Sequence, residues 1–119
     1  MAGVEEMMFG EFVRDKRLER KIGLREMARM ISVSPTYLSQ IERDAFPPPA
    51  ENKVKKIAEI LELDADELLA RAGRVSSDLT DIIKQRPRVM ADFLRSTDGM
   101  TPDDLAKVTR RFAKRSSRS

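Results

Sequence analysis

One stretch of this chain, residues 24–44, spaces its apolar residues as a helix does, with a single interruption at residues 32–34. The apolar members are Met27, Ala28, Ile31, Val33, Leu38 and Ile41. Two helices can share one small core only if a short turn reverses the chain between them, so the spacing predicts helix, tight turn and second helix. The second helix would present small and polar side chains that suit the edges of DNA bases better than a protein core. These side chains are Pro35, Thr36, Ser39 and Gln40.

The composition restricts the classes of protein to which this chain can belong. With 119 residues, 40% of them hydrophobic and 36% charged, the chain has room for one modest core, in one domain or in a small domain with an appendage. It contains no Cys, which excludes disulfides and thiol chemistry, and no His, which removes the usual general base and the commonest metal ligand. We therefore expect no catalytic residue, no metal site, no cofactor and no small-molecule ligand.

The sequence also predicts a soluble, cytoplasmic protein without a membrane partner. No apolar run approaches the ~20 residues that a membrane-spanning helix needs. The N-terminal residues include Glu5 and Glu6 and lack the pattern of a signal peptide.

The net charge of +3 is unevenly distributed along the chain. The last thirteen residues contain six basic residues and no acidic one. The six are Lys107, Arg110, Arg111, Lys114, Arg115 and Arg118. Residues 1–106 hold the other 17 basic residues and all 20 acidic ones, so this part of the chain needs a local basic surface to bind a polyanion. We expect residues 115–119 to form a disordered basic tail, which either solubilises the chain end or contacts nucleic acid.

Periodicity and capping residues predict five helices in residues 1–73. They are expected at residues 7–21, from 24 to 30 or 31, from 35 to about 43, from 50 to about 61, and between Asp64 and Gly73. Ser34 is placed to cap the third of these helices, and Pro35 opens it. The inward-facing residues of the first helix are expected to be Phe9, Phe12 and Val13, followed by either Leu18 or Ile22.

Residues 74–114 are predicted to form shorter amphipathic helices. Their start signals are Ser76 with Ser77, Pro87, and Thr101 with Asp104. Such helices bury little surface alone, so their apolar residues need a further partner. We predict that this partner is a second copy of the chain; completion of the monomer core and binding of another protein are the alternatives. The predicted dimerisation residues are Leu79, Ile82, Ile83, Val89, Phe93, Leu94, Leu105, Val108 and Phe112.

Four segments, taken in order, resemble the lambda-repressor-like, Xre-type family of helix-turn-helix regulators of bacteria and phages. They are R-L-E-R-K-I-G-L-R-E-M-A, V-S-P-T-Y-L-S-Q-I-E-R, a loop that ends in proline, and K-I-A-E-I-L-E-L-D-A-D-E-L-L, all within residues 9–69. The resemblance implies an all-α fold. A five-helix DNA-binding domain would occupy residues 1–73, and a short helical segment for dimerisation would occupy residues 74–114.

The resemblance also implies roles for the residues around the predicted turn. Residues 24–31 become the positioning helix, and residues 35–43 become the recognition helix, which would enter the major groove of double-stranded DNA. Base contacts are assigned to Pro35, Thr36, Ser39 and Gln40. Phosphate contacts are assigned to Arg25, Ser34, Tyr37 and Arg43. A Gln amide can form two hydrogen bonds with adenine, and a helix N-terminus favours an anion.

Arg17 and Glu42 occupy positions where this family often has an ion pair between its first and third helices. Such a pair would hold the recognition helix in place; the alternative is an ordinary surface pair worth less than about 1 kcal/mol. Three residues depart from the family pattern. Gly23 replaces the usual Ser or Thr cap, and Leu24 replaces a Gln that contacts phosphate in some relatives. The acidic Asp44 makes the loop after the recognition helix a poor phosphate contact.

Together these inferences predict a sequence-specific DNA-binding transcriptional regulator that represses its own promoter. One helix-turn-helix contacts few base pairs, so we expect a homodimer on a palindromic operator whose half-sites lie ~34 Å apart. Control would come from a protein partner, proteolysis or abundance, since the sequence shows no sensor domain. Some regulators of this kind are inactivated by a separate zinc metallopeptidase.

Two other classes of function remain open. The chain could be an antitoxin that binds a toxin through its C-terminal helices and its own promoter through the same helix-turn-helix. A fragment of a cyanase-like enzyme is the third interpretation, which the short length and the missing catalytic segment disfavour.

Overall fold

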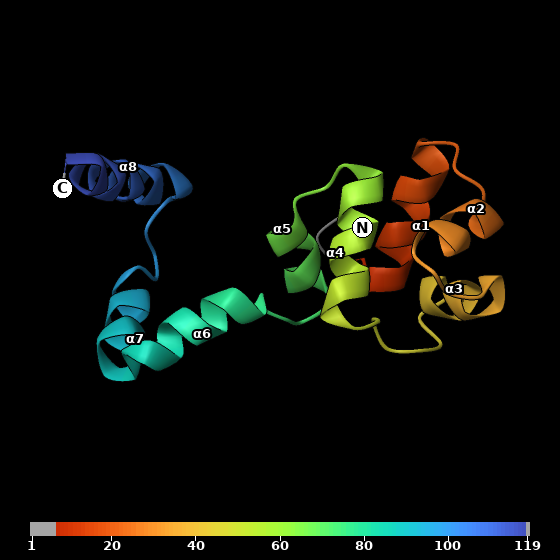
Figure 1. Ribbon diagram of the computed structural model, residues 1–119, viewed down its shortest axis with the longest axis horizontal. Coiled ribbons are helices and arrows are strands. Elements are labelled where there is room, and N and C mark those ends of the chain that lie inside the picture. The colour runs from red at the N-terminus through yellow and green to blue at the C-terminus, as the bar shows by residue number, and fades with distance from the viewer. Residues whose placement is uncertain (1–6, 119) are drawn as a thin grey trace. The chain divides into compact units, whose positions relative to one another are not determined.

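The computed structural model describes residues 7–118, and all the regular structure in this range is helical (Figure 1). The described range divides between Ser77 and Asp78 into an N-terminal unit and a C-terminal unit. The division lies four residues after the predicted domain boundary at residue 73. No helix within residues 7–118 is both long and apolar enough to cross a membrane.

Five helices form the N-terminal unit, as the sequence predicts. They are α1 (Phe9–Glu19), α2 (Leu24–Met30), α3 (Pro35–Glu42), α4 (Glu51–Leu61) and α5 (Ala65–Arg71). Helix α3 packs on both α1 and α2, and α4 packs on α5. Each of the five helices contributes to one apolar core. Its fully buried side chains include Val13, Met27, Leu38, Ile57 and Leu69.

Of the two candidates for the last inward-facing residue of the first helical segment, Ile22 and not Leu18 contacts the core. Phe9, Phe12 and Val13 are buried, as expected. Ile22 packs against the core, whereas Leu18 is 52% exposed. The inward position four residues after Val13 is occupied by Arg17, which is 7% exposed. Because residues four apart share a helix face, the neighbouring Leu18 turns toward solvent.

The turn between α2 and α3 reverses the chain in a few residues. Ser32 adopts the left-handed conformation, with φ of +59°, and the amide of Val33 donates to the carbonyl of Ala28 at 2.9 Å. Ser34 then caps α3, because its hydroxyl oxygen accepts a hydrogen bond from the amide of Tyr37 at 3.0 Å. These local bonds produce the helix, turn and helix that the interrupted spacing predicts.

Helix α1 and the end of α3 approach each other closely. The Gly10 amide donates to Oδ1 of Asp44 at 2.8 Å, and the Glu11 amide donates to Oδ2 at 3.2 Å. Asp44 therefore caps the N-terminus of α1, where Met8 supplies no side-chain cap. A Cβ atom at position 10 would overlap the carbonyl oxygen of Ile41, so the contact requires glycine at this position.

Basic side chains of the N-terminal unit satisfy backbone carbonyls at helix ends and in a loop. Lys53 Nζ donates to the carbonyl of Ile31 at the end of α2 at 2.7 Å, and Arg20 Nε donates to that of Leu61 at the end of α4 at 2.8 Å. Arg74 donates to the carbonyls of Pro48 and Pro49 in the loop before α4. These cations stabilise helix ends and a loop.

The C-terminal unit has apolar surfaces but lacks a buried core. Its helices are α6 (Ser77–Gln85), α7 (Pro87–Ser96) and α8 (Pro102–Arg118). Thr101 and Asp104 form the predicted capping box, with each side chain accepting from the other residue's amide. Helix α8 continues to Arg118, so the tail predicted at residues 115–119 is helical as far as the structure describes it. No residue between 78 and 115 is buried.

Replacing Gly10 tests the close approach of α1 to α3. We expect Gly10→Ala to lower the free energy of unfolding by at least about 1–3 kcal/mol, because the new methyl group displaces a backbone carbonyl. Gly23→Ala is the control, since a Cβ there meets no atom within 4 Å. Alanine is a poorer N-cap than glycine, which destabilises the folded state, but it also makes the unfolded chain less flexible, which stabilises the folded state. Because these two effects oppose each other, the free energy of unfolding changes by less than about 1 kcal/mol. Equal urea midpoints for the two variants would contradict the requirement for glycine at position 10.

Candidate nucleic-acid interface

Helix α3 presents one face to the core and another to the surface. Leu38, Ile41 and Glu42 are buried, and they anchor the helix to the rest of the N-terminal unit. The four side chains assigned to base contacts lie outside this buried set. Thr36 is exposed, and Pro35, Ser39 and Gln40 are half-buried. The sequence therefore places its candidate base readers on the accessible part of α3.

The Gln40 side chain is oriented by its neighbour beyond the helix end. Nη2 of Arg43 donates to Oε1 of Gln40 at 3.3 Å, one helical turn away. An amide oxygen has two lone pairs, so Oε1 can accept this bond and a second one while the amide nitrogen donates. That combination of acceptor and donor matches the edge of adenine in the major groove.

The candidate phosphate contacts lie on α2 and around α3. Arg25 is exposed in the first turn of α2, and Arg43 is exposed just beyond α3. Ser34 is also exposed; its oxygen accepts the capping bond, which leaves the hydroxyl hydrogen available to a phosphate. Tyr37 is half-buried, with its ring centroid 6.0 Å from that of Phe46.

Arg17 and Glu42 form a buried ion pair between α1 and α3. Nε of Arg17 donates to Oε2 of Glu42 at 2.7 Å, and Nη2 donates to Oε1 at 2.8 Å. A third bond runs from Nη1 to the carbonyl of Ile22 at 2.9 Å. The two side chains are only 8% and 4% exposed, which overturns the alternative of an ordinary surface pair. The hydrogen bond with Glu42 raises the pKa of Arg17 above its already high ordinary value.

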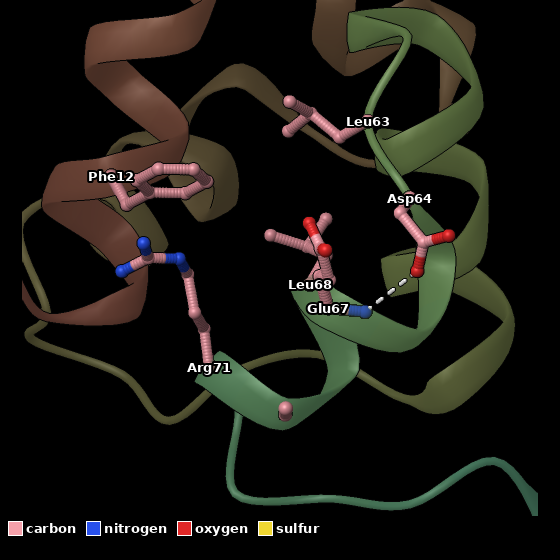
Figure 2. Close-up of a pocket in the computed structure, with 7 residues that line it drawn as sticks. Phe12, Leu63, Asp64, Glu67, Leu68 and Arg71 are labelled. Atoms are coloured by element: carbon pink, nitrogen blue, oxygen red, sulfur yellow. Dashed lines mark hydrogen bonds between the residues drawn. The ribbon is translucent and has the colours of Figure 1, made fainter. Parts of the chain in front are cut away.

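A hollow of about 530 Å³ lies between α1 and α5, away from the α3 surface residues described above (Figure 2). The guanidinium of Arg71 stacks on the ring of Phe12, 3.8 Å from its centroid. Asp64 accepts the amide of Glu67 at 2.9 Å as the cap of α5, and Glu62 pairs with Arg20. Within residues 7–118 no group of acidic side chains is arranged to hold a metal ion. Asp64 and Glu62 have local structural roles, as a helix cap and an ion-pair partner.

Sequence reasoning missed two residues that support the interface. Asp44 caps α1 from 34 residues away, and Lys53 holds the end of α2 from 22 residues away. The local signal for Asp44 is its place two residues after the last residue of α3, where a short polar side chain tolerates the left-handed conformation; Asp44 has φ of +58°. Neither partner is visible in the sequence, because both contacts depend on how helices pack.

Comparison with known proteins shows the family to which this chain belongs. The family model described as a helix-turn-helix domain matches residues 10–74. The chain is 33% identical over 75 residues to the uncharacterized HTH-type transcriptional regulator Rv0474 of Mycobacterium tuberculosis, covering 63% of this chain and 53% of that protein. It is 34% identical over 67 residues to the HTH-type transcriptional repressor RghR of Bacillus subtilis, covering 56% and 50%. The chain thus spans about half the length of these curated relatives.

One solved structure resembles almost the whole chain in fold. It is a chain of the SinR protein/SinI protein complex, with a TM-score of 0.50 at 22% identity, covering 92% of this chain and 99% of that one. The matched family model and the all-helical fold lead to one conclusion. The chain belongs to the helix-turn-helix family in its lambda-repressor-like, Xre-type form, a class of DNA-binding transcriptional regulators.

Truncating the buried ion pair tests its importance for the domain. We expect Glu42→Ala to lower the free energy of unfolding by roughly 3–5 kcal/mol, because Arg17 keeps its charge in a buried site without its partner. Glu59→Ala is the matched control, since it breaks the exposed pair with Lys56 and changes stability by less than about 1 kcal/mol. Urea unfolding followed by circular dichroism measures both, and similar losses would contradict a special role for the buried pair.

Proposed function

We propose that this chain is a sequence-specific transcriptional repressor that acts as a homodimer on a palindromic operator, including the operator of its own promoter. The observation that carries the proposal is the geometry of α3. The helix is anchored from behind by the Arg17–Glu42 pair, while Thr36 and Gln40 lie one turn apart on its accessible side. The relatives named as transcriptional regulator and repressor support the same function.

In the proposed complex, α3 lies in the major groove, where some of its side chains contact bases and others contact phosphates. Gln40 forms two hydrogen bonds with an adenine, and Thr36 contacts a neighbouring base edge or a thymine methyl group. Ser34, Arg25 and Arg43 bind phosphate oxygens and set the position of the helix along the duplex. Base contacts determine which DNA sequence is bound, whereas phosphate contacts position the protein on the duplex. Substitutions in the two groups of residues should therefore affect DNA binding differently.

Gln40→Ala tests the base contact. Selection of bound duplexes from random sequence should yield a palindrome for the wild-type protein. The variant should lose preference at one position in each half-site, equivalent to about 1–3 kcal/mol of discrimination. Arg25→Ala serves as the contrast, because it should weaken binding to every duplex without changing the selected sequence. Salt-sensitive binding without any sequence preference in the wild-type protein would reject the proposal.

The homodimer is proposed to form through the C-terminal unit. All nine predicted dimerisation residues lie in α6, α7 and α8, and the packing of these three helices on one another buries none of them. The apolar side chains of α7 and α8 line a groove of about 350 Å³, which includes Phe93, Leu94 and Val108. Helices with exposed apolar faces are stabilised when a second copy covers them.

Phe93→Asp tests the dimer interface. We expect a monomer by sedimentation equilibrium and a large loss of operator affinity, because a carboxylate would be desolvated between the two copies. Gln85→Asp introduces the same side chain at an exposed polar position of α6 and should leave the dimer intact. A Phe93→Asp protein that still sediments as a dimer would exclude this surface. Copurification of a small partner protein on the same helices would instead favour the antitoxin function.

A further inference from the structure

Helix α8 carries a continuous stripe of positive charge. We use the name basic stripe for Lys107, Arg110, Arg111 and Lys114, which lie within about 100° of one another around the helix and therefore share one side of it. All four side chains are exposed. Arg110 and Arg111 form no ion pair or hydrogen bond with any described residue, and no acidic residue occurs in the helix after Asp104.

The apolar residues of α8 occupy a different face. Leu105, Val108 and Phe112 are three or four residues apart, and at roughly 100° per residue the centre of their face lies about 140° from that of the basic stripe. These three residues line the groove that α8 forms with α7. Arg111 lies at the border between the two faces, since it lines a hollow together with Val108 and Phe112. A second copy of the chain that covers the groove would therefore leave Lys107 and Arg110 open to solvent, with Arg111 at the edge of the covered surface.

The N-terminal unit has no excess of positive charge. Residues 1–77, which make up this unit, contain 13 basic and 14 acidic residues. Several of these basic side chains have structural partners, since Arg20, Lys53 and Arg74 donate to carbonyls and Arg17 is buried against Glu42. Double-stranded DNA carries about one negative charge per 1.7 Å of its axis, and sequence-independent affinity comes from neutralising those charges.

We propose that the basic stripe of α8 binds the phosphate backbone of DNA and adds sequence-independent affinity to the contacts of α3. The inference rests on the proposed function, because it assigns a second surface for the same ligand. A membrane surface is the less favoured partner. A helix that lies on lipid must present its apolar face to the bilayer, and in α8 that face lines the groove with α7.

The test measures how DNA affinity depends on salt. The full chain and an Arg110→Gln, Arg111→Gln variant are titrated with the selected operator and with an unrelated duplex of equal length at several salt concentrations. Removing two phosphate contacts should lower the slope of log K against log salt by about 2 and weaken both duplexes by the same factor. The Arg110→Lys, Arg111→Lys variant keeps both charges and should retain the wild-type slope. Sedimentation equilibrium checks that all three proteins remain dimers.

The outcomes separate this inference from the proposed function. An unchanged slope in the Gln variant, with operator binding intact, overturns the inference alone. Binding that depends on the basic stripe but shows no sequence preference supports the inference and rejects the sequence-specific function. Failure of the wild-type protein to bind either duplex rejects both. Binding of the wild-type chain but not the Gln variant to vesicles of phosphatidylcholine with phosphatidylserine, with an unchanged DNA slope, assigns the stripe to lipid and overturns the inference.

Discussion

The placement of α3 depends on the buried ion pair between Arg17 and Glu42. Both charges are almost fully removed from water, so the pair persists only because its two short hydrogen bonds and the bond to the Ile22 carbonyl satisfy the guanidinium. Desolvation offsets much of the attraction in such pairs, and their net contribution to stability is small. Their geometric effect is larger, because a bidentate Arg–carboxylate contact permits one mutual orientation of the two helices.

A second contact joins the same end of α3 to the opposite end of α1. Asp44 follows α3 and caps the N-terminus of α1, and the absence of a side chain at Gly10 permits this approach. The ion pair and the cap therefore constrain α3 from α1 at separate points along α1. A helix held in this way keeps Thr36 and Gln40 in place without further ordering, which lowers the entropic cost of any contact that they make.

The two units of the chain use their charged and apolar residues differently. In the N-terminal unit the apolar residues form a core, and several cations stabilise helix ends. In the C-terminal unit the apolar residues line an open groove, and cations gather on α8. The apolar residues of the first unit thus hold its helices together, whereas the second unit keeps apolar and basic side chains exposed along its helices.

The sequence alone determined the helices, the turn and the accessible face of α3. Periodicity, the Ser34 cap and Pro35 act over a few residues, so these features follow from local chemistry. Tertiary structure decided what depends on distant residues: the choice of Ile22 over Leu18, the burial of Arg17 with Glu42, and the use of Asp44 as a cap. These contacts join residues far apart in the chain, and only helix packing determines which of them meet.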